Sequence, residues 1–460
     1  MQNKSRVTLF LFLSIFIFTS GTIDLNNLFN YANQSKPAYI VKDNTPGSNA
    51  ITDAGATLGR VLFYDKKLSV NGTIACANCH KQEFAFGDTA IQSVGLNGGL
   101  TGRHSMRLVN SRFADEVRFF WDERATSLEN QTTQPIQDHI EMGFSGTNGD
   151  PDLDSLTRRL EKISYYQQLF QLAYGSTQIN EVKIQNALSQ FIRSIQSFDS
   201  KFDVGRAQAP NINAQFANFT AAENAGKQLF LAPPNAGGAG CQGCHRGPEF
   251  DIDPNSLNNG VIAVAGNQTT IDLTNTRAPS LRDLFNNNGI LNGPLMHNGA
   301  FRTIEQVIEH YNLVPNNNSL DQRLRGPGGN LQLTAQEKSQ LIAFLKTLSG
   351  SAIYTETKWS NPFDLAGNIS LTPTSAAISF NKELEGFKIY PNPAKEYIKL
   401  SLPEGNFSLQ IFTLDGKILL HSQVQHTSQI SIAHLNSGVY LVRVFDSENK
   451  RQFASKLIKP

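Results

Sequence analysis

All four cysteines of this 460-residue chain lie in two copies of one pentapeptide, Cys-x-x-Cys-His. The first copy is Cys76-Ala-Asn-Cys79-His80, and the second is Cys241-Gln-Gly-Cys244-His245. This spacing is the attachment signature of c-type haem, in which two thiols bond to the haem vinyl groups and the histidine binds the iron. The pair of motifs therefore predicts two covalently bound haem c groups, each enclosed by its own part of the chain.

Two other uses of these cysteines explain the pattern less well. The motifs are 165 positions apart (241 − 76), and a zinc site does not require a histidine directly after each cysteine pair. Two local disulfides would suit an exported chain, but they would leave the two histidines unexplained. We therefore predict that His80 binds the first haem iron and His245 the second.

The N-terminal residues predict export. Lys4 and Arg6 precede an apolar run over residues 7–18, and small residues follow it. This is the pattern of a secretory signal peptide, which we place at residues 1–22, and the apolar run is shorter than a typical membrane span. The chain is therefore expected to enter the periplasm.

Hydrophobic periodicity around the two motifs predicts a mainly α-helical fold. Apolar residues recur at three- and four-residue spacing over residues 153–174 and 179–198. Thr334-Ala-Gln-Glu337 forms a capping box ahead of a further amphipathic stretch. We place one haem domain at residues 23–205 and the other at residues 206–350.

After Gly350 the composition changes and predicts a separate β domain. Residues 351–385 are rich in Ser, Thr, Asn and Pro, which is typical of a linker. From residue 386 onward, short runs alternate apolar and polar residues, and Leu414-Asp-Gly-Lys417 supplies a hairpin turn. We predict a small all-β sandwich of immunoglobulin-like type over residues 386–460.

Four motifs mark this tail: Tyr390–Pro393, Leu414–Gly416, Leu435–Arg443 and Ser455–Lys459. Together they resemble the C-terminal sorting domain of type IX secretion substrates. The resemblance implies recognition by the type IX secretion machinery and removal of the tail, with the mature protein secreted or left at the cell surface. A generic adhesive or carbohydrate-binding β module is the alternative.

Short motifs also flank the two pentapeptides. Around the first they are Leu58–Asp65, Leu68-Ser69, Phe84–Asp88, Phe120–Arg124 and Glu141–Gly143, and around the second they are Pro279–Arg282 and Gly293–Gly299. This ordered set resembles the bacterial di-haem cytochrome c peroxidase and MauG superfamily. The resemblance implies a peroxidatic haem in the first domain and an electron-transfer haem in the second.

The resemblance implies catalytic roles for three residues near the first haem. Glu141 corresponds to a distal carboxylate, which can move a proton between the two oxygens of peroxide, and Gln131 would orient the peroxide. Trp121 corresponds to a tryptophan between the haems that relays electrons. Without the resemblance, Glu141 and Gln131 would be ordinary helix-surface residues and Trp121 a core aromatic.

The sequence departs from the classical peroxidases at the first haem. Many of those proteins carry an iron-binding histidine in a Ser-Val-Gly-His segment, 16 residues after the first haem histidine. Here the corresponding segment is Ser93-Val-Gly-Leu96 (96 − 80 = 16). Leucine cannot bind iron, so we expect an open coordination position that is ready for peroxide.

The sequence also departs from the classical peroxidases at the second haem. The family places an axial methionine 14 residues after the histidine that corresponds to His297, and this chain has Tyr311 there, as the MauG branch does. The resemblance therefore implies Tyr311 as a ligand of the second iron, with Met296 and His297 as rivals. Tyr311 also shares a predicted helix face with Ile304 and Ile308, so a purely structural role in the core is the alternative.

The resemblance further implies a calcium ion between the haems. Asn292 and Pro294 fall at the positions of its carbonyl ligands, whereas His104 replaces the usual side-chain ligand.

Taken together, these features predict an exported di-haem peroxidase that reduces hydrogen peroxide with electrons from a small cytochrome c or similar redox protein. A MauG-like oxidase acting on a protein or organic substrate is one alternative, and a non-enzymatic electron-transfer cytochrome is another. With 40 Lys and Arg against 39 Asp and Glu, no overall positive charge favours nucleic acid. The family resemblance allows a homodimer.

Overall fold

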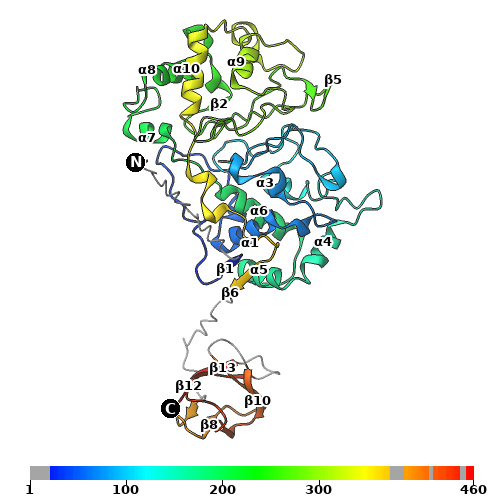
Figure 1. Ribbon diagram of the computed structural model, residues 1–460, viewed down its shortest axis with the longest axis vertical. Coiled ribbons are helices and arrows are strands. Elements are labelled where there is room, and N and C mark those ends of the chain that lie inside the picture. The colour runs from blue at the N-terminus through cyan, green and yellow to red at the C-terminus, as the bar shows by residue number, and fades with distance from the viewer. Residues whose placement is uncertain (1–20, 373–387, 414–417, 446–451) are drawn as a thin grey trace, which may run out of the picture. The chain divides into compact units, whose positions relative to one another are not determined.

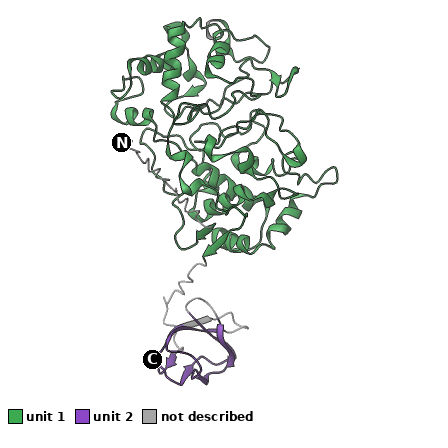
Figure 2. Ribbon diagram, viewed as in Figure 1, with its two compact units in different colours: residues 1–372 green, residues 373–460 purple. Residues whose placement is uncertain are grey.

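The computed structural model describes residues 21–372, 388–413, 418–445 and 452–460. The chain divides into an N-terminal unit, residues 1–372, and a C-terminal unit, residues 373–460 (Figure 2). Nearly all of the predicted signal peptide lies outside the described residues. In the described ranges, no helix is both long enough and apolar enough to span a membrane.

The N-terminal unit has two helical halves (Figure 1). In the first half, five helices surround one apolar core: α1 (Asp53–Tyr64), α3 (Leu128–Thr133), α4 (Leu153–Leu160), α5 (Ser164–Tyr174) and α6 (Glu181–Ser194). Helices α1 and α6 approach closely at Gly59, where an added Cβ would lie 1.9 Å from the Ala187 carbonyl oxygen. The short helix α2 (Cys76–Cys79) carries the first motif beside this core.

The second half packs α7 (Lys201–Gln208), α8 (Ala221–Leu231), α9 (Ile304–Asn312) and α10 (Ala335–Lys346) around a second core rich in phenylalanine. The predicted capping box begins α10, because the Thr334 side chain accepts from the Glu337 amide and Glu337 accepts in return. Two short hairpins complete this half: β2 (His245–Arg246) with β3 (Asp251–Ile252), and β4 (Ala263–Val264) with β5 (Asn267–Ile271).

Residues 351–372 return from the second half to the first. Trp359 is 2% exposed within the first core, and its Nε1 donates to the Ser194 carbonyl oxygen at 3.1 Å. Strand β6 (Ser370–Thr372) then pairs in parallel with β1 (Thr22–Asp24). The packed unit thus extends past residue 351, where composition predicts a linker; residues 373–385 of that linker lie outside the described part. Turn-forming composition does not reveal an anchor such as Trp359.

The C-terminal unit is all β among its described residues. One antiparallel sheet has the order β10 (Ile418–Val424), β9 (Phe407–Phe412), β12 (Gly438–Phe445), β13 (Gln452–Lys459), and the other has the order β11 (Thr427–Ser431), β8 (Tyr397–Ser401), β7 (Lys388–Tyr390). Both sheets contribute to a single apolar core. The predicted all-β character is confirmed, while the immunoglobulin-like type remains a prediction. The predicted turn at 414–417 lies outside the described residues.

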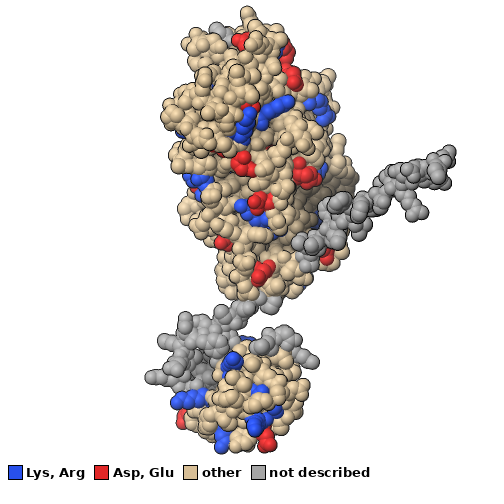
Figure 3. Space-filling model, turned by 60° about the vertical axis from the view of Figure 1, so that its left-hand side comes forward, with Lys and Arg blue, Asp and Glu red and all other residues tan. Residues whose placement is uncertain are grey.

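On the face of the N-terminal unit in Figure 3, acidic and basic side chains are interspersed rather than gathered into one patch. This distribution agrees with the nearly balanced formal charge of +1.

Candidate haem sites

The first motif holds its histidine in the orientation that an iron ligand needs. His80 directly follows α2, and its Nδ1 lies 3.1 Å from the Phe86 carbonyl oxygen. Ala85 and Phe86 adopt left-handed backbone angles (φ 54° and 59°), which turn this carbonyl back toward the ring. Burial lowers the pKa of His80, which favours the neutral ring. An imidazole that donates from Nδ1 to a carbonyl leaves Nε2 free to bind iron.

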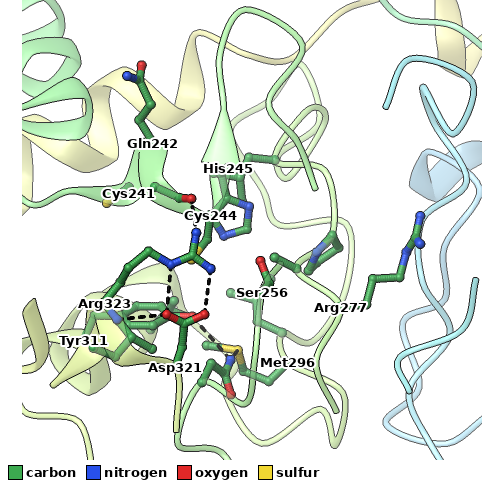
Figure 4. Close-up of a pocket in the computed structure, with 18 of the residues that line it drawn as sticks. Cys241, Gln242, Cys244, His245, Ser256, Arg277, Met296, Tyr311, Asp321 and Arg323 are labelled. Carbon is green, nitrogen blue, oxygen red and sulfur yellow. Dashed lines mark hydrogen bonds and ion pairs between the residues drawn. The ribbon is translucent and has the colours of Figure 1, made fainter. Parts of the chain in front are cut away.

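The second motif lies in a cavity of about 960 Å³ (Figure 4). Cys241, Cys244 and His245 line it together with many apolar side chains. Burial lowers the pKa of His245 to about 4. His245 Nδ1 is buried without a hydrogen-bond partner among the described residues. Two thiols and one neutral imidazole in a large, mostly apolar cavity fit a haem attached through this motif.

The four thiols do not gather around one ion. Cys76 packs against the core of the first half, and Cys241 packs against the core of the second. Burial raises the pKa of both thiols to about 12 and that of Cys79 and Cys244 to about 11. The two cysteine pairs lie in separate cores, which argues against one zinc site shared by all four thiols.

A smaller cavity of about 300 Å³ lies at the segment that follows α3. Glu141 and Pro135 line it with Arg124, Gln134, Gln137 and Asp138. Burial raises the pKa of Glu141 to about 7, and the charge of Asp138 adds to this rise while Arg124 opposes it. The charge of Glu141 in turn acts on the thiols of the first motif, so this carboxyl lies near them.

The two glutamines in this segment differ in position. Gln134 lines the smaller cavity, whereas Gln131, which the sequence predicts to orient peroxide, is not among its lining residues. Gln131 lies within α3, whereas Gln134 lies directly after the last residue of that helix.

The Ser93–Leu96 segment, which has leucine where the classical peroxidases have an iron-binding histidine, lies against the residues that carry Glu141. The Leu96 amide donates to the carbonyl oxygens of Ile140 at 2.7 Å and of Glu141 at 3.1 Å. The Leu96 side chain is 8% exposed and packs toward Gly143. Backbone hydrogen bonds therefore hold this loop against the segment that carries Glu141.

Trp121 connects the two halves. Its indole Nε1 donates to the His104 carbonyl oxygen at 2.7 Å, and its own carbonyl accepts from the amides of Thr276 at 3.0 Å and Arg277 at 3.1 Å. Its ring meets that of His297 edge-on, with centroids 6.2 Å apart. Trp121 also lines the larger cavity, so it lies where the second haem site borders the first half.

Two of the proposed ligands of the second iron share one hydrogen-bond donor. Asn259 Nδ2 lies 3.3 Å from both Tyr311 Oη and Met296 Sδ, and both side chains line the larger cavity. In Figure 4 they lie across the cavity from His245. Burial raises the pKa of Tyr311 above its ordinary value. His297, the third proposed ligand of the second iron, has its Nε2 3.1 Å from the Ala263 carbonyl oxygen.

The residues expected near calcium lie at the border of the two halves. Asn292 Nδ2 donates to the Asp283 carbonyl and to Tyr354 Oη, each at 2.8 Å, while its Oδ1 is buried without a hydrogen-bond partner among the described residues. Pro294 lines the larger cavity. His104 Nδ1 is 2.9 Å from the Ala90 carbonyl oxygen. The free Asn292 oxygen suits a cation, whereas His104 offers one nitrogen in place of an oxygen.

Sequence reasoning did not single out Arg124, Gln134 or Arg323. Arg124 is the last residue of the Phe120–Arg124 motif, and Gln134 directly precedes Pro135, so both carry a local sequence signal. Arg323 lies in the larger cavity, where its Nη2 forms an ion pair with Asp321 at 2.6 Å (Figure 4). Nothing in its local sequence marks it, because tertiary packing brings it beside the second motif.

Comparison with known proteins agrees with this geometry. The family model described as di-haem cytochrome c peroxidase matches residues 53–209, and the secretion system C-terminal sorting domain matches residues 388–460. The methylamine utilization protein MauG of Methylophilus methylotrophus is 32% identical over 318 residues, which cover 67% of this chain and 86% of that protein. The cytochrome c551 peroxidase of Nitrosomonas europaea is 27% identical over 307 residues, which cover 64% of this chain and 80% of that protein.

Among solved structures, a MauG-like protein associated with microbial copper homeostasis superposes with a TM-score of 0.58 and 30% identity. The match covers 72% of this chain and 99% of that one.

Proposed function

The chain belongs to the di-haem cytochrome c peroxidase and MauG family, and we propose that it is an exported peroxidase that reduces hydrogen peroxide to water. Electrons would come from a small cytochrome c or a similar redox protein. The observation that carries this proposal is the partly buried Glu141, which lines a cavity near the first motif and whose pKa of about 7 suits proton transfer.

The two pentapeptides would hold the haems. Cys76 and Cys79 would attach the first, Cys241 and Cys244 would attach the second, and His80 and His245 would bind the irons. When bound, the haems supply the redox chemistry. The Phe86 carbonyl supports this role for His80, because it leaves only Nε2 available for a metal.

Glu141 would accept the proton of the near peroxide oxygen and return it to the far oxygen, so that water can leave. A carboxyl with a pKa near 7 exists in both forms at neutral pH, so it can do both. Arg124 and Gln134 line the same cavity and can hold a small polar molecule there. Gln131 remains the orienting residue by resemblance alone, and Trp121, through its contacts to both halves, would relay electrons.

A MauG-like oxidase is the second candidate, and Tyr311 favours it. A phenolate oxygen is a harder, anionic ligand than a thioether, so it stabilises oxidised iron. Tyr311 lines the cavity of the second motif, as this role requires. Such an enzyme would use peroxide to oxidise a protein or organic substrate.

The ferric absorption and EPR spectra of the purified holoprotein, before and after peroxide, test this proposal. We expect one high-spin and one low-spin haem, with the high-spin signal consumed by peroxide. Two low-spin haems that ignore peroxide would instead indicate an electron-transfer cytochrome. Steady-state turnover with reduced cytochrome c then separates peroxidase from oxidase.

The C-terminal sorting domain indicates export by type IX secretion. We further propose a signal peptide at residues 1–22 and a mature protein that is released or kept at the cell surface. A calcium ion near Asn292 and Pro294 is proposed from the family resemblance and the free Asn292 oxygen. Metal analysis of the holoprotein before and after chelation tests it.

A further inference from the structure

Beside the first haem motif, one buried carboxylate accepts hydrogen bonds from two adjacent tyrosines. Asp65 Oδ2 accepts from Tyr165 Oη at 2.6 Å and from Tyr166 Oη at 2.9 Å. Asp65 Oδ1 accepts from the Lys67 amide at 2.8 Å, which holds the carboxylate in place. Asp65 is 3% exposed, so these three donors replace most of its solvent. The roles proposed above for the haem-site residues do not use this cluster.

The two tyrosines lead from the first haem motif toward the surface. Tyr166 is fully buried in the core of the first half. Helix α2, which carries Cys76, and helix α5, which carries both tyrosines, each pack against α1, and Asp65 directly follows α1. Tyr165 is partly exposed, and its ring centroid lies 4.6 Å from that of Tyr166. Aromatic rings in such contact, one inside and one outside, offer a short route for an electron.

The carboxylate supplies what oxidation of a buried phenol requires. Burial first, and then the charge of Asp65, raises the pKa of both tyrosines above the ordinary value, so both are protonated phenols. A phenol that loses an electron becomes a strong acid and needs a base within hydrogen-bond reach, about 2.6–3.2 Å. Asp65 lies within that distance of both hydroxyls.

We propose that Tyr166, Tyr165 and Asp65 form a redox relay, which carries an oxidising equivalent from the first haem site to a one-electron donor at the surface beside Tyr165. The relay rests on the proposed function, because peroxide must first oxidise the first haem. It would serve donors that are too large to reach that haem.

The relay balances in electrons and protons. Tyr166 gives one electron to the peroxide-oxidised haem, its O–H bond breaks, and the proton bonds to Asp65 Oδ2. Tyr165 then gives one electron to the Tyr166 radical and its own proton to Asp65, while the first proton returns to Tyr166. A donor finally supplies one electron to the Tyr165 radical, and Asp65 returns the proton to the Tyr165 oxygen, which restores both the phenol and the carboxylate.

Tyr174 is a matched control on the same helix. Its hydroxyl donates to the Lys183 backbone carbonyl oxygen at 3.1 Å. A carbonyl accepts a hydrogen bond but does not take up a proton at neutral pH. Tyr174 also belongs to the aromatic row that runs from Tyr166 through Phe170, so proximity alone does not distinguish it.

Freeze-quench EPR of the holoprotein after addition of hydrogen peroxide tests the relay, with absorption spectra recorded in parallel. We expect a free-radical signal that changes shape when the protein carries ring-deuterated tyrosine. Tyr166→Phe should abolish this signal, and Tyr174→Phe should retain it. Tyr165→Phe should retain the radical but slow the oxidation of the bulky dye ABTS.

These outcomes separate the relay from the peroxidase proposal. If peroxide changes the haem spectrum but wild type shows no tyrosyl radical, or Tyr166→Phe keeps it, the relay is wrong and the peroxidase proposal stands. If peroxide leaves the haem spectrum unchanged, the peroxidase proposal fails first. Each Tyr→Phe variant removes one oxygen, and its haem absorbance shows that it has folded.

Discussion

The two Cys-x-x-Cys-His segments share a motif but have different surroundings. The first is a short helix whose histidine is fixed by the Phe86 carbonyl, near a cavity of about 300 Å³ that contains Glu141. The second lines a cavity of about 960 Å³ that contains Tyr311 and Met296. On the proposed function, the shared motif would attach a haem in the same way at both sites, and the different residues around each cavity would give the two haems different roles.

Removing the carboxyl that we propose as the proton carrier of the first site should have the strongest effect. Glu141→Gln keeps the shape but cannot accept a proton, so the reaction of the first haem with peroxide should slow by about 10²–10⁴-fold. Stopped-flow absorbance measures this rate. Glu305→Gln, at an exposed glutamate in the second half, should leave it unchanged. An unaltered rate in Glu141→Gln would exclude Glu141 as the proton carrier.

A second change would supply a histidine that can occupy the open coordination position of the first haem. Leu96→His places an imidazole on the loop held against Glu141, so the first haem should become six-coordinate and low-spin in the ferric state. Its reaction with peroxide should slow by about tenfold or more, equivalent to about 1.4 kcal/mol of added barrier. EPR reports the spin state. Leu100→His, at a position that is 51% exposed, is the control; the same high-spin signal in both variants would contradict the proposed geometry.

A third change tests whether Tyr311 binds the second iron, as proposed. Tyr311→Met should raise the reduction potential of the second haem by on the order of 0.1 V, within the ~0.8 V range that axial ligands span. Spectroelectrochemistry measures it. Met296→Leu is the matched variant, because Asn259 contacts both side chains. A shift in Met296→Leu with none in Tyr311→Met would assign the ligand to Met296.

The pH dependence of the reaction with peroxide should follow the titration of Glu141 at the first site. Because burial raises the pKa of Glu141 to about 7, its basic form is lost below that pH, and the peroxide rate should fall about tenfold per unit there. The same rise in pKa means that protonated Glu141 stabilises the folded state. This contribution to the free energy of unfolding is fully present below about pH 4.5 and is lost as the pH rises through about 7.

Asp138→Asn sharpens this prediction. Asp138 Oδ1 accepts from the amides of Ile140 at 2.8 Å and Glu141 at 3.0 Å, and an asparagine oxygen can keep both bonds. Only the charge is lost, so the midpoint of the pH–rate profile should move to lower pH. A midpoint that stays in place would show that Asp138 does not act on Glu141.

The weakest effects are expected from replacing either of the two glutamines near the smaller cavity. Gln134→Ala should slow the peroxide reaction about fivefold, the value of one hydrogen bond of about 1 kcal/mol. Gln131→Ala should do less, because only Gln134 lines the smaller cavity. The reverse order would support the orienting role that the family resemblance implies for Gln131.

Several elements could be predicted because their signals are local. The capping box at Thr334 begins α10 as expected, and the apolar period over 179–198 corresponds to α6. The period over 153–174 instead forms two helices, α4 and α5, separated at 161–163. Apolar spacing marks a buried face but does not show where the backbone turns.

The contacts between distant segments could not be predicted. Asp65 meets Tyr165 and Tyr166 from 100 positions away, and Trp359 returns to the first core. No local pattern marks such pairs, because burial in a shared core creates them.

The sequence was sufficient to identify the two Cys-x-x-Cys-His motifs, the family and the sorting tail, since each is recognised from short local motifs and their order along the chain. Only packing brought Gln134 to the smaller cavity, Asn259 into contact with both Tyr311 and Met296, and one carboxylate into contact with two tyrosines. Thioether attachment requires only a local spacing of side chains, whereas a proton or an electron moves between groups that packing brings within a few ångströms of each other.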